Sequence, residues 1–236
     1  MRDTVIPVLR LQSVKKCFGA FTAVQGVSEV FLPGELICAI GPNGAGKSTL
    51  LNMICGTIPV SEGSILFGDK VINGLAPEKI ARLGIARKFQ VPSVFESLSV
   101  FENLMLAAGR HGDEGAIEAL VDKVHLRADR NVRGADLPHG RKQWLEIGMA
   151  LSMKPKVLLL DEPTAGLSVD ETRDTARFLK QLRGQMTVIV IEHDMAFVRE
   201  LDARTIVLHH GALIASGPFE DIEKNETVRD VYLGRR

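Results

Sequence analysis

Gly41-Pro42-Asn43-Gly44-Ala45-Gly46-Lys47-Ser48 decides the fold, because this stretch matches the pattern G-x-x-x-x-G-K-[ST] at every fixed position. The apolar run 36–40 before it predicts a buried strand, and residues 48–54 after it predict a helix. A glycine-rich turn between strand and helix points backbone N–H groups at a polyphosphate. We therefore expect a nucleoside triphosphate to bind here; the alternative is an ordinary glycine turn with a solvated lysine.

The side chains of this loop suggest how a triphosphate is held. Lys47 is placed to reach the β- and γ-phosphates, and the Ser48 hydroxyl is placed to bind Mg²⁺. The residues expected to contact the nucleotide in this segment are Gly41, Pro42, Asn43, Gly44, Ala45, Gly46, Lys47, Ser48 and Thr49.

Length and charge narrow the class of protein. The chain has 236 residues, of which 45% are hydrophobic, so it suits one large domain or one domain with an insertion. Its 29 basic and 29 acidic residues give no electrostatic signal for nucleic acid, and no apolar run approaches the roughly 18 residues that span a bilayer. Three separated cysteines, Cys17, Cys38 and Cys55, are typical of reduced core thiols. We expect a cytoplasmic protein that reaches a membrane only through a partner.

The hydrophobic pattern predicts an α/β fold, with the mostly parallel sheet of a P-loop NTPase core and an antiparallel N-terminal β subdomain. Continuous apolar runs at 156–160 and 187–191 predict parallel strands that are covered on both faces. We take residues 1–236 as one nucleotide-binding domain with a helical subdomain, 91–153, inserted in it. Further strands are expected at 9–14, 24–30, 64–68, 71–74, 203–208 and 211–217, and helices at 77–83, 100–106, 115–124, 139–151 and 170–182.

Two carboxylates directly follow the apolar run 157–160. Asp161, at the carboxyl end of a buried strand near the phosphate loop, can bind Mg²⁺ through water. Glu162 points differently along the strand and can polarise an attacking water. Either carboxylate could instead cap the next helix, but the loop upstream favours catalysis.

The order of these motifs resembles the ATP-binding subunit of an ABC (ATP-binding cassette) transporter, and the resemblance covers residues 9–234. It implies ATP and Mg²⁺ as cofactors. It further implies that Phe18 stacks on adenine and that Gln90 touches Mg²⁺ and the attacking water. His193, just past the predicted strand 187–191, is expected to hydrogen-bond the γ-phosphate and to orient Glu162. Taken alone, Phe18 would be core packing, Gln90 a surface amide and His193 a structural histidine.

The family's signature motif, Leu-Ser-Gly-Gly-Gln, aligns with Leu137, Pro138, His139, Gly140 and Arg141, which the resemblance places against the γ-phosphate of the opposite subunit. Pro138 lacks a hydroxyl and a backbone donor. His139 and Gly140 keep N–H groups at a helix N-terminus, and Arg141 adds a cation. Because one hydrogen bond to a charged group is worth about 1.5–3 kcal/mol, we expect weakened but not abolished ATPase activity.

Other stretches resemble one branch of the family. His139 followed by residues 142–149, together with residues 94–104 and 231–234, resembles the urea-type ATPases of the branched-chain amino-acid importer group. Lipopolysaccharide-export ATPases share a similar length and tail. A third alternative is an ATP-gated regulatory module that hardly turns over, which Pro138 favours and Glu162 and His193 oppose.

The resemblance implies several partners. A second ABC ATPase subunit, identical or related, would pack head to tail with this chain around two ATP molecules. Integral membrane permease subunits would hold the chain at the inner face of the membrane, and a periplasmic solute-binding protein would act indirectly. The groove after Gln90, including Val94 and Phe95, would receive a cytoplasmic helix of the permease; for Val94 and Phe95 the alternative is core packing. The solute itself cannot be read from this subunit.

Overall fold

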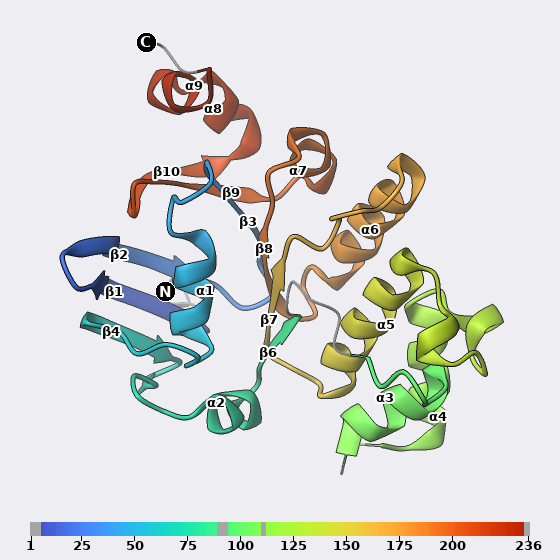
Figure 1. Cartoon of the computed structure of the whole chain (residues 1–236). Coiled ribbons are helices and arrows are strands. Elements are labelled where there is room, and N and C mark those ends of the chain that lie inside the picture. The colour runs from blue at the N-terminus through green and yellow to red at the C-terminus, as the bar shows by residue number, and fades with distance from the viewer. Residues whose placement is uncertain (1–5, 89–93, 110–111, 234–236) are drawn as a thin grey trace, which may run out of the picture.

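The computed structural model describes residues 6–88, 94–109 and 112–233 and contains two β-sheets (Figure 1). The smaller sheet is antiparallel, with strand order β2-β1-β4-β5. Its strands are β1 (Leu9–Phe18), β2 (Phe21–Phe31), β4 (Glu62–Phe67) and β5 (Lys70–Val71). The predicted N-terminal antiparallel sheet is therefore confirmed.

The larger sheet has six strands in the order β10-β9-β3-β8-β7-β6, and all neighbours except β10 and β9 are parallel. In the register of the central strands, Ile191 pairs with Ala39 on one side and with Asp161 on the other. The carboxyl ends of these strands therefore meet at one edge, which is where open α/β sheets bind ligands. The strands are β3 (Leu36–Ile40), β6 (Ile85–Lys88), β7 (Val157–Asp161), β8 (Thr187–Ile191), β9 (Arg204–His209) and β10 (Ala212–Pro218).

Each face of the large sheet has its own hydrophobic core. Along β3, Ile37 and Ala39 pack with helix α1 (Lys47–Ile54) and the small sheet, whereas Cys38 and Ile40 pack with the helices on the other side. Figure 1 shows α1 on one face of the sheet and α5 and α6 on the opposite face. Every residue of β3, β7 and β8 is buried, as their continuous apolar sequences predict.

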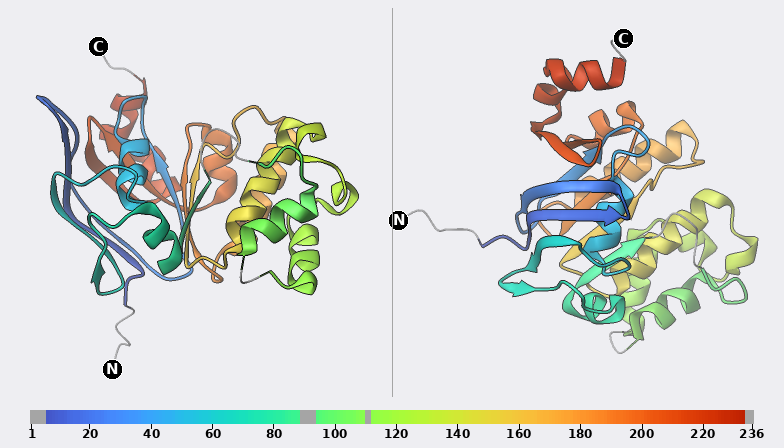
Figure 2. Two further views of the ribbon diagram at one scale, coloured as in Figure 1. Left: turned by 60° about the horizontal axis from the view of Figure 1, so that its bottom comes forward. Right: turned by 60° about the vertical axis from the view of Figure 1, so that its left-hand side comes forward.

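The helices between β6 and β7 gather on one side of the molecule (Figure 2). They are α3 (Val100–Ala108), α4 (Glu114–Lys123) and α5 (His139–Ser152), with short 3-10 turns η2 (Arg127–Asp129) and η3 (Gly134–Asp136). The remaining helices are α2 (Pro77–Leu83), α6 (Val169–Leu182), α7 (Met195–Leu201), α8 (Phe219–Lys224) and α9 (Glu226–Leu233). Within the described ranges, no helix combines the length and apolarity needed to cross a bilayer.

The structure also corrects the sequence-based expectations. The expected strand 71–74 is wrong: β5 ends at Val71, because the Asn73 side chain bonds Ile65 N and Gly63 O and turns the chain. Strand β6 and helices α7, α8 and α9 were not anticipated. Cys38 and Cys55 are buried free thiols, as expected, but Cys17 is only partly buried.

Candidate active site

The phosphate loop runs against neighbouring backbone so closely that glycine is required at two positions. A Cβ on Gly41 would lie 2.2 Å from the carbonyl oxygen of Leu208. A Cβ on Gly46, which is the N-cap of α1 and has φ 98°, would lie 2.5 Å from the carbonyl oxygen of Ala23. The loop is therefore fixed between β9 and β2, and its last glycine starts the helix.

Lys47 lies folded back over this loop. Its Nζ donates to the carbonyl oxygens of Gly41, at 2.6 Å, and Pro42, at 3.1 Å, and the residue is only 8% exposed. Burial lowers the pKa of Lys47, while the charges of Glu162 and Asp161 act in the opposite direction. An ammonium group in this position can exchange carbonyl oxygens for phosphate oxygens without a large movement.

Asp161 ends β7 and contacts two different groups with its two oxygens. Oδ1 lies 3.5 Å from Ser48 Oγ at the start of α1. Oδ2 lies 3.0 Å from an Arg87 nitrogen, in an ion pair whose side chains are both nearly buried. The structure thus brings together Ser48 and Asp161, two of the three residues that the sequence predicted as metal ligands, and it adds Arg87, which was not predicted.

Glu162 and His193 face each other across neighbouring strand ends. His193 Nδ1 lies 3.6 Å from Glu162 Oε1, and the side chains are 64% and 25% exposed, respectively. Glu162 has φ 45°, a backbone conformation that is unusual for a non-glycine residue and is frequent at functional sites. A partly exposed carboxylate beside an imidazole can accept a proton from a bound water.

Glu192, next to His193, is a buried carboxylate that the sequence interpretation passed over. It accepts hydrogen bonds from Thr164 N at 3.1 Å, Thr164 Oγ1 at 2.5 Å and His193 N at 3.1 Å. It therefore ties the loop 163–168 to the end of β8. At the end of this loop Ser168 and Glu171 form a capping box for α6, which lowers the pKa of Glu171 through the hydrogen bonds from Ser168.

Residues 137–141 lie against the loop 163–168 of their own chain. Helix α5 begins at His139, as expected, and Pro138 is its N-cap. His139 Nε2 and Gln143 Nε2 lie 3.1 Å and 2.7 Å from the carbonyl oxygen of Ala165. Because α5 and α1 pack on opposite faces of the large sheet, this motif is remote from the phosphate loop of the same chain (Figure 1).

Three residues of the aligned motif pack against other parts of their own chain. Arg141 donates to the carbonyl oxygen of His125 at 2.7 Å and lies 3.6 Å from Asp129. A Cβ on Gly140 would lie 2.3 Å from Glu171 Oε1, so glycine allows α5 and α6 to approach closely here. Leu137 is buried in the core beside α5.

Phe18 and Gln90 are further residues expected to contact the nucleotide or its metal ion. Phe18 is half-exposed at the end of β1, and Lys16 Nζ lies 4.9 Å from the centre of its ring. The ring is thus available for stacking rather than buried in the core. Gln90 lies outside the described residues.

Strand β6 contributes a second buried cation, Lys88, which pairs with Glu146 of α5 at 3.6 Å. Burial lowers the pKa of Lys88, and Glu146 opposes this effect. The consecutive basic residues Arg87 and Lys88 could have pointed to these ion pairs from the sequence, because buried charges require partners of opposite charge.

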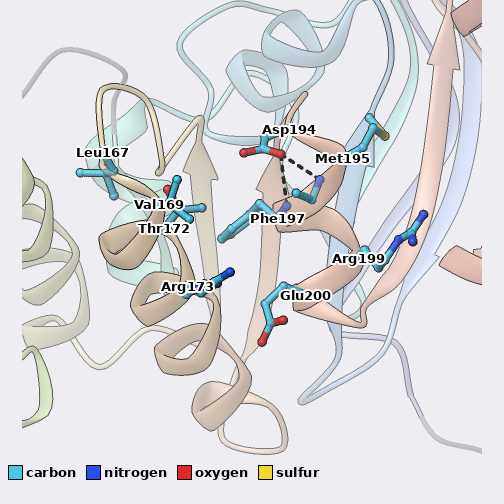
Figure 3. A pocket seen from close by; sticks show the side chains of 10 residues that line it. Leu167, Val169, Thr172, Arg173, Asp194, Met195, Phe197, Arg199 and Glu200 are labelled. Carbon is cyan, nitrogen blue, oxygen red and sulfur yellow. Dashed lines mark hydrogen bonds between the residues drawn. The ribbon is translucent and has the colours of Figure 1, made fainter.

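A cleft of about 620 Å³ lies between α6 and α7 (Figure 3). Its lining includes Leu167, Val169 and Met195, and Asp194 caps α7 at its rim by accepting from the backbone N–H groups of Ala196 and Phe197. None of the phosphate-loop residues lines this cleft, so we place the candidate active site at the sheet edge instead.

Known proteins resemble this chain along nearly all of its length. The sequence profile of the ABC transporter family matches residues 24–165. The high-affinity branched-chain amino acid transport ATP-binding protein LivG of Escherichia coli K12 is 32% identical, with 97% of this chain and 98% of LivG covered. The lipopolysaccharide export system ATP-binding protein LptB of Acidithiobacillus ferridurans is 31% identical, with 96% and 97% covered. The solved ADP conformation of MJ1267, an ATP-binding cassette of an ABC transporter, is 29% identical with a TM-score of 0.87, covering 97% of this chain and 99% of that one.

Proposed function

The chain belongs to the ABC transporter family, and from this premise we propose that it is the ATP-hydrolysing subunit of an importer for branched-chain or related amino acids, or for urea. One observation carries the proposal: Lys47, Ser48, Asp161, Glu162 and His193 all lie where the strands of one sheet end. Phosphoryl transfer needs positioning and charge neutralisation above all, and these side chains are suited to supply both.

Hydrolysis requires an activated water at the γ-phosphorus. In the proposed reaction the Glu162 carboxylate takes a proton from the water as the new P–O bond forms. The bond from the γ-phosphorus to the bridging oxygen breaks, and the charge passes to the departing diphosphate, where Lys47 lies. His193, 3.6 Å from Glu162, orients the carboxylate and contacts the γ-phosphate. For Gln90, in the segment between β6 and α3, we propose contacts with Mg²⁺ and with the attacking water.

The residues present fit a magnesium ion. Ser48 Oγ and Asp161 Oδ1 are hard oxygen donors 3.5 Å apart, and Arg87 occupies the other oxygen of Asp161. When bound, Mg²⁺ would neutralise charge on the β- and γ-phosphates. The backbone of residues 41–49 would hold the phosphates and Phe18 would stack on the adenine.

A second subunit would complete each site. Residues 137–141 start α5 on the face of the sheet opposite α1, so a nucleotide on one chain can meet them only from another chain. Backbone N–H groups of His139 and Gly140 would contact the γ-phosphate, and Arg141 would contribute only long-range charge because Asp129 and His125 already engage it. The partner is a second copy or a related ATPase.

Permease subunits would dock near residues 94 and 95. Phe95 is 48% exposed, and its backbone N–H and carbonyl are both bonded to the Asn103 side chain, which fixes the turn that presents the ring. Val94 packs against the core and supports docking only indirectly. We propose that this contact holds the chain at the inner face of the cell membrane and links ATP-driven closure to transport of a solute delivered by a periplasmic binding protein.

An exporter is the second candidate, because the similarity to LptB covers 96% of the chain, against 97% for LivG. His139 and the residues 142–149 favour the importer group. Copurification of the chain with its permeases separates the two: an importer brings permeases that function with a periplasmic solute receptor, and an exporter brings permeases that function without one.

The ATPase proposal is tested by steady-state phosphate release from the unaltered chain and from Glu162→Gln. Loss of a general base typically lowers the rate by roughly 10²- to 10⁴-fold, and we expect that fall here. Glu200→Gln, an exposed carboxylate of α7, is the control and should keep the full rate. If the unaltered chain and Glu162→Gln both release phosphate only at the background rate, the regulatory module is favoured instead.

A further inference from the structure

Arg87 connects three segments of the candidate active site. From β6, one of its terminal nitrogens lies 3.0 Å from Asp161 Oδ2 at the end of β7. The other lies 2.6 Å from Asn52 Oδ1 and 3.2 Å from Cys55 Sγ, both in the helix region that follows the phosphate loop. The Arg87 guanidinium thus links β6 to the end of β7 and to α1, the two elements that carry Asp161 and Ser48.

The contacts of Arg87 with Asp161 and Asn52 require an arginine side chain. The side chains of Arg87 and Asp161 are 7% and 3% exposed, so little water screens the pair. A planar guanidinium can hold two acceptors in a fixed relation, whereas a lysine ammonium on a flexible stem cannot reproduce that fork. Asn52 therefore fixes the plane of the guanidinium, and the guanidinium fixes the carboxylate.

The contact with Arg87 gives the two carboxylate oxygens of Asp161 different partners. Oδ2 is directed at Arg87, and Oδ1 is directed at Ser48 Oγ, 3.5 Å away. We propose that Arg87 is a positioning residue that holds Oδ1 of Asp161 toward the magnesium ion of the bound nucleotide. This inference rests on the proposed function, because it assumes that Mg²⁺ and ATP bind at Ser48 and Asp161.

Two possible roles of Arg87, orienting the Asp161 carboxylate and supplying a positive charge, predict opposite effects of its substitution on Mg²⁺ binding. If Arg87 acted only as a positive charge near the metal, its removal would strengthen Mg²⁺ binding, and lysine would replace it without effect. If Arg87 orients the carboxylate, Arg87→Lys will weaken Mg²⁺ binding although the positive charge is kept. Groups that orient metal ligands typically contribute 10- to 100-fold to metal affinity.

The test is a titration of Mg²⁺ that measures binding of a fluorescent ATP analogue to the full chain, in a Glu162→Gln background that prevents hydrolysis. For Arg87→Lys we expect the half-saturating Mg²⁺ concentration to rise about tenfold, while affinity for the analogue in EDTA stays unchanged. Asn52→Ala, which keeps Arg87 but frees its plane, should raise the same concentration a few-fold.

Arg204→Lys is the matched control, since Arg204 also forks between acceptors, Glu35 and Val30 O, but at the opposite end of the sheet. It should leave the Mg²⁺ titration unchanged, and thermal unfolding identifies any general loss of stability. An Arg87→Lys titration like that of the parent chain, or an equal loss of affinity with and without metal, would overturn the inference. Failure of the parent chain to bind the nucleotide would instead overturn the proposed function.

Discussion

Gly46 shows how one residue sets the geometry of the phosphate loop. It combines φ 98° with a space in which a Cβ would overlap the Ala23 carbonyl oxygen. Gly46→Ala therefore adds the cost of a left-handed backbone, about 1–2 kcal/mol, to an overlap that costs about another 1–3 kcal/mol. We expect a clear fall in the free energy of unfolding of the nucleotide-free chain, measured by urea denaturation.

Gly44 offers a control in the same loop. It has φ 79°, but no atom lies within 4 Å of the place where its Cβ would be. Gly44→Ala should therefore show only the backbone cost. Equal destabilisation by the two substitutions would mean that the contact with Ala23 does not limit the loop.

The sequence brought to notice the residues that we propose to react, but it did not reveal the residues that contact them. Lys47 and Ser48 stand in one local pattern and Asp161 and Glu162 in another, and each pattern follows a strand that the sequence predicts to be parallel, so both were expected at the carboxyl edge of the sheet. Arg87 meets Asp161 only through pairing of β6 with β7, across 74 positions of sequence. No local pattern encodes such a contact, and Glu192 was overlooked for the same reason.

At the scale of single elements, the start of α5 is expected to limit the ATPase rate of the proposed composite site. Pro138 occupies the N-cap and makes no side-chain capping bond. Pro138→Ser supplies a capping hydroxyl, worth about 0.5–2 kcal/mol, partly offset by the greater freedom of the unfolded chain. It also restores a hydroxyl and an N–H donor for the γ-phosphate. We expect the steady-state ATPase rate to rise roughly tenfold.

Pro218→Ser is the matched control, because Pro218 is the uncapped N-cap of α8, outside the site. It should change stability in the same way and leave the ATPase rate unchanged. If both variants accelerate hydrolysis alike, or if Pro138→Ser does not accelerate it, residues 137–141 do not contact the γ-phosphate as proposed.

Elements marked by continuous apolar runs were predicted well, whereas β6, α7, α8 and α9 were not anticipated. β7 and β8 are continuously apolar and stand out from their flanks. β6 spans four residues, two of them basic, and it is a strand only because β7 pairs with it and buried carboxylates neutralise its charges. Tertiary context, rather than local propensity, forms this strand.

At the scale of the whole molecule, the large sheet separates the phosphate loop from the surface that is proposed to contact the partner subunits. The face with α1 holds the phosphate loop, and the face with α3, α4 and α5 carries residues 137–141 and the exposed Phe95 (Figures 1 and 2). The carboxyl edge joins the two, because β3, β6, β7 and β8 all end there. In the proposed mechanism, a change at the γ-phosphate reaches both faces through these strand ends.

Calorimetric titration of Mg·ATP into the Glu162→Gln chain tests the central claim most directly, with a Lys47→Ala version of the same chain beside it. The account predicts a saturable heat for the first, and an affinity roughly ten- to a hundredfold lower for the second, because Lys47 loses a charged hydrogen bond to phosphate. No heat from folded protein, or equal affinities for the two chains, would contradict it.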